Sequence, residues 1–237
     1  MSEQQSIRLS KRMAELGLCS RGEADDYIAQ GLVLVDGKVV DVLGSRVLPE
    51  QQIELLAGGP REQPDRVSML LHKPAGVDET ALLAQLVPAR RAADDASQLV
   101  YMRKHQHRLQ WFGALQAGDS GLTVATQDGK LARQLQAGDF EQEWLVNLAA
   151  PLSDAALKSL QGGVELNGRQ LRAGRVSRQS ERQLCVVLKK PVPGMIAAML
   201  AANGLRALEC RCIRIGRVRL GKLPAGQWRY FATLDKF

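Results

Sequence analysis

The sequence predicts an α+β fold in two parts. A small domain of two short helices and a β-hairpin precedes a larger domain with a largely antiparallel sheet flanked by helices. The length of 237 residues allows one sizeable core and a small satellite domain. Residues 57–66 are rich in Gly, Pro and charge, as linkers are, and beyond them short apolar runs alternate with turn and helix-cap signals. We therefore place domains at 1–58 and 67–237, joined by a linker at 59–66.

The composition is that of an ordinary globular protein, with 45% hydrophobic and 24% charged residues. No apolar run is long enough for a membrane span, and the first residues lack signal-peptide character, so we expect a cytoplasmic monomer without a membrane partner. Four cysteines without CxxC spacing and three histidines predict free structural thiols, no metal and no cofactor. Zinc binding by Cys210 and Cys212 is the alternative, but a second pair is missing.

The net charge of +7 is concentrated in the last third of the chain. Residues 1–60 carry six Lys or Arg against nine Asp or Glu, residues 61–150 carry ten against eleven, and residues 151–237 carry sixteen against five. A localised basic surface is typical of a protein that binds a polyanion such as RNA. A merely soluble basic protein is the alternative.

The first domain begins with two predicted helices. One is predicted by apolar residues on a single face, Leu9, Met13 and Leu16, followed by Gly17 as its stop. The second begins with the capping-box spacing of Ser20 to Glu23, ends at Gly31, and faces inward with Ala24, Tyr27 and Ile28. Residues 32–40 predict a hairpin with its turn at Asp36-Gly37, and a further strand includes Ile53 and Leu55.

This arrangement resembles the S4 RNA-binding domain, on the residues Ile7–Arg12, Cys19–Ala24, Ile28, Gly31, Val33, Val35 and Asp36-Gly37. In that family the cations of the first helix and the Ser-Arg at the start of the second face structured RNA, and a helix N-terminus suits a phosphate. The resemblance implies RNA contacts by Arg8, Ser10, Lys11, Arg12, Ser20, Arg21 and Lys38. The alternative is a solvated face, which the net negative charge of this domain favours.

The second domain is predicted to begin with a buried strand at 67–72 and a turn at 73–76. Residues 89–110 are polar and irregular, with a basic cluster of Arg103, Lys104, His105, His107 and Arg108. This cluster either holds a phosphate, with Arg103, Lys104 and Arg108 as RNA contacts, or forms a surface loop. Gly113–Leu122 then leads into a short buried strand, Leu122–Ala125, a place where α+β enzymes commonly present a reactive side chain.

The remaining elements alternate helices and strands. Helices are predicted at 130–135, at 153–160 with Ser153 as cap, and at 194–202. Strands are predicted at 143–148 and 184–188, and Asn167-Gly168 marks a hairpin turn. Alternating Arg and apolar residues at 211–220 predict a strand pair with one buried and one basic face.

The order of elements and several motifs resemble the RsuA/RluB/RluE/RluF group of ribosomal RNA pseudouridine synthases over essentially the whole chain. Besides the S4 segment, the resemblance rests on Leu71–Gly76, Gly121–Gly129 and Arg214–Arg229. These enzymes flip a uridine out of RNA and use the aspartate of a Gly-Arg-Leu-Asp motif to break and remake the bond between base and sugar. Here Gly113-Ala114-Leu115-Gln116 places Gln116 at the aspartate position. A neutral amide can neither attack the sugar nor accept a proton.

Two further departures accompany Gln116. The family's tyrosine, in a pattern like Glu-x-Tyr-x-Val, corresponds to Trp144, and the first arginine of its Arg-Gln-(Ile/Val)-Arg-Arg-Met helix start corresponds to Gly194. In the family that arginine pairs with the aspartate, so losing one partner alone would leave an unpaired charge at a cost of about 3–5 kcal/mol. Losing both leaves a neutral pocket, in which Trp144 either fills the vacated space or stacks on an extruded base.

Three functions are consistent with these residues. The first is an RNA-binding protein that has lost the reaction, with ribosomal RNA or a ribosome precursor as its partner. The second is an active pseudouridine synthase in which Asp119 supplies a displaced carboxylate, although a small misplacement of a catalytic group costs about a hundredfold in rate and Asp119 suits a turn. The third is a protein-interaction or ribosome-assembly module.

Overall fold

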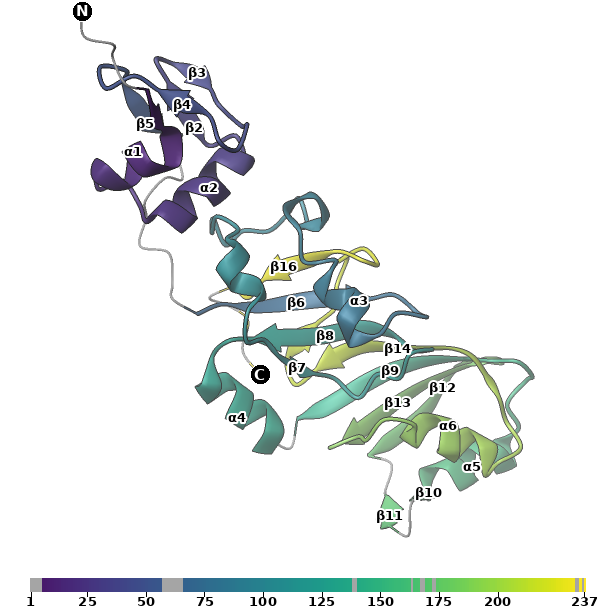
Figure 1. Cartoon of the computed structure of the whole chain (residues 1–237). Coiled ribbons are helices and arrows are strands. Elements are labelled where there is room, and N and C mark those ends of the chain that lie inside the picture. The colour runs from purple at the N-terminus through teal and green to yellow at the C-terminus, as the bar shows by residue number, and fades with distance from the viewer. Residues whose placement is uncertain are drawn as a thin grey trace, which may run out of the picture. The chain divides into compact units, whose positions relative to one another are not determined.

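The computed structural model describes residues 6–56, 66–137, 140–162, 164–166, 169–171, 174–232, 235 and 237. It forms two compact units, one drawn from residues 1–65 and 98–107 and the other from residues 66–97 and 108–237 (Figure 1). The predicted linker lies outside the described residues except for Arg66. Within the described ranges, no helix is long and apolar enough to cross a membrane, no three His, Cys, Asp or Glu gather as metal ligands, and the four cysteines are free.

The N-terminal unit contains the predicted helices and hairpin. Helices α1 (Leu9–Glu15) and α2 (Arg21–Ala29) accompany two small sheets, which comprise β1 (Ile7–Arg8) with β4 (Arg46–Val47), and β3 (Lys38–Val39), β2 (Val33–Val35) and β5 (Ile53–Leu55). The capping box at Ser20 is formed as predicted. Leu9 and Met13 of the predicted apolar face are buried, whereas Leu16 is 47% exposed, because α1 ends at Glu15 and Gly17 turns the chain at a φ of 71°.

A segment from much later in the chain completes the core of this unit. Gln98–His107, which we call the strap, groups with the N-terminal unit although the residues on both sides of it belong to the second unit. Val100 and Met102 of the strap join the hydrophobic cluster that contains Leu9 and Tyr27, and Met102 is fully buried. The predicted division of the chain at residue 66 does not include this return.

The second unit is built on a nine-stranded sheet in the order β12-β13-β9-β14-β8-β6-β16, with β15 beside β14 and β7 beside β8. Its strands are β6 (Ser68–Lys73), β7 (Gln110–Phe112), β8 (Ser120–Thr126), β9 (Glu141–Leu148), β12 (Arg175–Ser180), β13 (Gln183–Lys189), β14 (Ala207–Ile215), β15 (Val218–Arg219) and β16 (Trp228–Tyr230). Among these described strands, only β14 and β8 pair in parallel. The predicted largely antiparallel sheet is therefore confirmed.

Helices α3 (Glu79–Leu83), α4 (Gly129–Ala137), α5 (Asp154–Gln161) and α6 (Met195–Ala201) flank this sheet (Figure 1). Ser153 caps α5 as predicted, with its side chain accepting a hydrogen bond from the Ala156 N–H. The predicted turn at Asn167-Gly168 lies outside the described residues, between the paired strands β10 (Val164–Leu166) and β11 (Arg169–Leu171).

The strand pair predicted at 211–220 is present, but its basic face is partly neutralised. A register shift between Cys212 and Arg214 interrupts the alternation of β14. The Arg214 guanidinium then donates to Glu143 of β9 at 2.6 Å, and Arg211 is paired with Glu209 at 3.2 Å. Arg214 is therefore engaged with β9, and Arg211 with a carboxylate of its own strand, so neither cation is fully available to a polyanion.

Candidate functional site

The loop Gly113–Asp119 leads into β8, whose seven residues are all buried at the centre of the sheet. The loop closes as a turn because the Asp119 N–H donates to the Gln116 carbonyl at 3.1 Å and Asp119 Oδ2 accepts the Gln116 N–H at 2.8 Å. The Asp119 carboxylate thus holds the backbone of Gln116. Burial raises the pKa of Asp119, and the hydrogen bond from Gln116 opposes that shift.

Lys73, at the end of β6, donates hydrogen bonds to the same loop. Lys73 is only 4% exposed. Its Nζ donates to the carbonyl oxygens of Asp119 at 2.6 Å, Ala117 at 3.0 Å and Pro74 at 3.2 Å. Burial lowers the pKa of this ammonium group. Sequence reasoning placed Lys73 in a motif but assigned it no role, since its acceptors are backbone atoms.

Three adjacent strands, β8, β14 and β9, connect the end of this loop to Trp144. Gly121 of β8, Cys212 of β14 and Trp144 of β9 are register partners, so they form one row across the sheet. A β-carbon at Gly121 would lie 2.2 Å from the Cys212 carbonyl oxygen, so only glycine allows this close approach. Trp144 is 1% exposed, and its Nε1 donates to no acceptor among the described residues.

The three residues at the family positions meet around one cavity. Gln116, Trp144 and Gly194 line it together with Asp119, and its volume is about 10 Å³. That volume suits about one water molecule. Gly194 has a φ of 83°, and a β-carbon there would lie 3.1 Å from Gln116 Nε2. Gln116 and Gly194 therefore fit each other, and a side chain at residue 194 would enter the space that Gln116 occupies.

Two larger hollows flank β7 beside this cavity. One, of about 400 Å³, is lined by Phe140, Gln142 and Lys190 among others, and the second, of about 190 Å³, is lined by Lys73 and Thr123 among others. Trp111 contributes to both hollows. The unfilled volume of this region therefore lies beside Trp111 rather than at Gln116.

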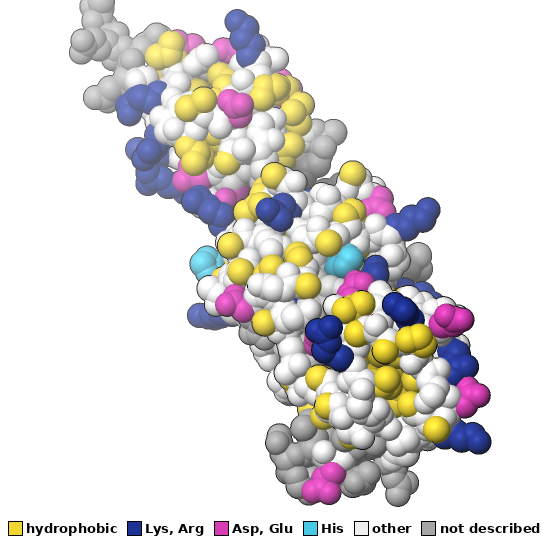
Figure 2. Space-filling model, turned by 90° about the vertical axis from the view of Figure 1, so that its right-hand side faces the viewer, with side chains coloured by type: hydrophobic (Ala, Val, Ile, Leu, Met, Phe, Trp, Pro, Cys, Tyr) yellow, Lys and Arg dark blue, Asp and Glu magenta, His cyan; other side chains and the backbone are white. Residues whose placement is uncertain are grey.

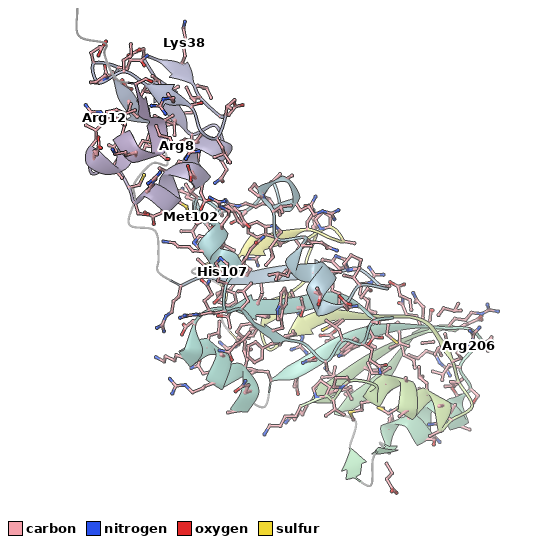
Figure 3. All side chains as sticks on the ribbon, viewed as in Figure 1. Arg8, Arg12, Lys38, Met102, His107 and Arg206 are labelled. Carbon is pink, nitrogen blue, oxygen red and sulfur yellow. The ribbon has the colours of Figure 1, made fainter. Side chains whose placement is uncertain are left out.

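In the N-terminal unit, most of the predicted RNA-contact residues are at the surface. Arg8, Lys11, Arg21 and Lys38 are exposed, and Figure 3 shows the Lys38 side chain pointing away from the hairpin. Arg12 is half-buried and donates to the Pro49 carbonyl at 3.1 Å. Ser10 differs from the rest, because it is 2% exposed and lies inside the unit.

The start of α2, where a phosphate was expected, already carries a carboxylate. Glu23 accepts hydrogen bonds from Lys104 Nζ at 2.9 Å and from the Ser20 N–H at 3.1 Å. These bonds, the one from Lys104 most of all, lower the pKa of Glu23 to about 2, so it stays ionised. The predicted basic cluster is also divided, because Arg103 and Lys104 lie in the strap of the N-terminal unit whereas Arg108 lies in the second unit.

Comparison with known proteins matches residues 7–53 to the S4 domain family. The chain is 30% identical over 228 residues to the "Dual-specificity RNA pseudouridine synthase RluF" of Escherichia coli O6:H1, covering 94% of this chain and 75% of that protein. It is 27% identical to an "Uncharacterized RNA pseudouridine synthase" of Aquifex aeolicus, covering 94% and 89%. A solved pseudouridylate synthase with 20% identity superposes over 96% of both chains with a TM-score of 0.58, which shows a shared fold.

Proposed function

Since the chain belongs to the RNA pseudouridine synthase family, we propose that it binds structured RNA of the ribosome or of a ribosome precursor without isomerising uridine. The observation that carries this proposal is the cavity between Gln116, Trp144 and Gly194, with its volume of about 10 Å³. The family reaction needs a carboxylate at the position of Gln116 and room for an extruded base. This cavity offers an amide and space for about one water molecule.

The matched character of the three residues supports the proposal. A lost aspartate alone would leave the family's arginine without its partner, and a buried unpaired charge is strongly destabilising. Here residue 194 is a glycine whose conformation and contact with Gln116 leave no place for that arginine. The indole of Trp144 is enclosed and lacks a hydrogen-bond acceptor among the described residues, which fits space-filling better than chemistry.

Asp119 is the residue on which the alternative, an active synthase, depends. It lines the same cavity, and its raised pKa resembles that of a general base. Its Oδ2 is nevertheless occupied by the Gln116 N–H, and its backbone is held by Lys73. Moving this carboxylate onto a substrate would break the turn that positions it.

A tritium-release assay separates the two functions. Ribosomal RNA labelled with tritiated uridine is incubated with the native chain, with Asp119→Asn, and with an active RluF protein as positive control. We expect release only from the positive control. Release by the native chain that Asp119→Asn abolishes would establish the active synthase instead.

The third function, a protein-interaction module, predicts a different result. In that case a protein partner would stay bound after nuclease treatment and at a salt concentration that disrupts contacts with phosphates. We expect partners recovered with the chain to be released by nuclease.

A further inference from the structure

The strap contacts α2 through both apolar and polar side chains. Val100 and Met102 enter the core of the N-terminal unit, at 7% and 0% exposure. Val100 and Met102 are two of the ten buried residues that form this cluster in the described part of the chain. The strap is therefore an integral part of the unit and not a covering loop.

Polar residues on one face of α2 hold the strap in antiparallel order. Gln30 Nε2 donates to the Tyr101 carbonyl at 2.6 Å. Asp26 accepts two hydrogen bonds from Arg103, from its N–H at 2.9 Å and from Nε at 2.8 Å. Glu23 accepts a hydrogen bond from Lys104 Nζ at 2.9 Å. Because positions 23, 26 and 30 share one side of a helix, they form a continuous docking surface for the strap.

Without the strap, this surface of α2 would repel RNA. Glu23 and Asp26 place two carboxylates beside Arg21, and residues 1–60 as a whole carry nine acidic against six basic side chains. The strap contributes Arg103 and Lys104 and contains no acidic residue. Docking therefore neutralises both carboxylates, and the Arg103 side chain remains 62% exposed while its Nε is bonded to Asp26.

We propose that the docked strap is a required part of the RNA-binding surface of the N-terminal unit. It converts an acidic face of α2 into one that accepts the phosphate backbone of RNA, and it places Arg103 on that surface beside α2. This inference rests on the proposed RNA-binding function and deepens it. It also explains why a unit with the S4 pattern is acidic in its own first 60 residues.

A charge-swap experiment on the full-length chain tests this inference. Lys104→Glu places a carboxylate against Glu23, and Glu23→Lys combined with Lys104→Glu re-forms the pair with the net charge of the native chain. Both side chains are partly exposed, at 28% for Glu23 and 40% for Lys104, so neither substitution buries a charge. Glu23→Lys also removes the acceptor of the Ser20 N–H, so Glu23→Lys alone is the control for the lost cap of α2. Strap docking is followed by hydrogen exchange of the Arg103 amide, which is bonded to Asp26. RNA affinity is measured with total ribosomal RNA at one fixed salt concentration.

We expect Lys104→Glu to accelerate exchange at Arg103 and to weaken RNA binding about tenfold, since it adds repulsion and releases the strap. The swapped pair should restore both properties. Faster exchange with unchanged RNA affinity would overturn the role of the strap and leave the proposed function intact. Restored exchange protection with affinity still lost would overturn it too, because Lys104 would then act by direct contact alone. Failure of the native chain to bind RNA would refute both proposals.

Discussion

Gln116 and Gly194 restrict each other at the scale of single residues. Gly194 precedes α6 in the left-handed region, at a φ of 83°, and faces the Gln116 amide. Residue 194 favours glycine because its backbone is left-handed. The Gln116 amide lies where a longer side chain at residue 194 would extend. Under the proposed function, this neutral pair replaces the charged pair of the family, and the two residues are in close contact.

Gly194→Ala should therefore destabilise the second unit by about 1–2 kcal/mol, the cost of a left-handed conformation for a residue with a β-carbon. Adding Gln116→Ala should not remove this cost, because the strain lies in the backbone. Urea unfolding measures both variants. Gly118→Ala is the control and should be neutral, because Gly118 lies in the loop of Gln116 and a β-carbon there would meet open space. Equal stabilities for the two single variants would refute this account of Gly194.

Lys73→Met should destabilise the second unit by about 1–3 kcal/mol, because it removes the ammonium group that donates to the carbonyl oxygens of Asp119 and Ala117, of which the Ala117 oxygen keeps the Gly76 N–H as a second donor. Lys130→Met removes an exposed lysine of α4 and serves as the control. Thermal unfolding followed by circular dichroism measures the difference. If the two variants unfolded alike, Lys73 would not be the residue that holds the loop.

Gln116 and Lys73 show which part of the site could be predicted from the sequence. Gln116 was located because a family motif fixes its position and its chemistry is visible as a change of residue type. Lys73 was not assigned a role, because β6 and β8 must first pair before the loop carbonyls come within reach of its ammonium group. Contacts to backbone atoms leave no pattern of side chains in the sequence.

Elements whose sequence signals lie within a few positions were predicted, whereas contacts between residues far apart in the chain were not. The capping box of α2, the turn at Asp36-Gly37 and the cap of α5 each involve residues within four positions of one another. The strap depends on contacts between residues 77 and 81 positions apart, such as Arg103 with Asp26 and Lys104 with Glu23. The sequence showed the same cations as a cluster without showing which unit they join.

The stability of the N-terminal unit should depend on pH through Glu23 of α2. Its pKa is lowered from 4.5 to about 2, first by the hydrogen bond from Lys104 and then by that from the Ser20 N–H. A lowered carboxyl pKa contributes stability that is present above 4.5 and is lost as the pH falls toward about 2. In Lys104→Met the pKa of Glu23 should rise toward 4.5, and the N-terminal unit should become less sensitive to pH in this range. Carboxyl chemical shifts followed by NMR measure the change. An unshifted Glu23 titration in the variant would contradict the assigned cause.

At the scale of the whole molecule, basic and acidic side chains are interspersed on the face that Figure 2 shows. Figure 2 shows Lys and Arg side chains over both units on the visible face, with acidic side chains among them. Ion pairs such as Arg214 with Glu143 and Arg229 with Asp235 engage several cations of the last third of the chain. We therefore expect RNA affinity to depend on a few exposed cations rather than on the net charge of +7.

The salt dependence of binding tests this expectation. With Arg8, Lys11, Arg21, Lys38 and Arg103 as phosphate contacts, the logarithm of the association constant should fall against the logarithm of salt concentration with a slope of about −4. Lys38→Ala should reduce the slope by about one. Arg206→Ala, which removes an exposed arginine outside the predicted contacts, should leave it unchanged. Equal slopes for both variants would show that the N-terminal cations are not specific contacts.

The central claim is that a member of the pseudouridine synthase family retains RNA binding around a site that no longer performs the reaction. Crosslinking of the full-length chain to RNA in cells, with pseudouridine mapped in the same RNA from native and deletion strains, tests it most directly. We expect reproducible crosslinks to structured ribosomal RNA and the same pseudouridines in both strains. A pseudouridine beside a crosslink that disappears in the deletion strain, and equally in a strain carrying Asp119→Asn, would contradict it.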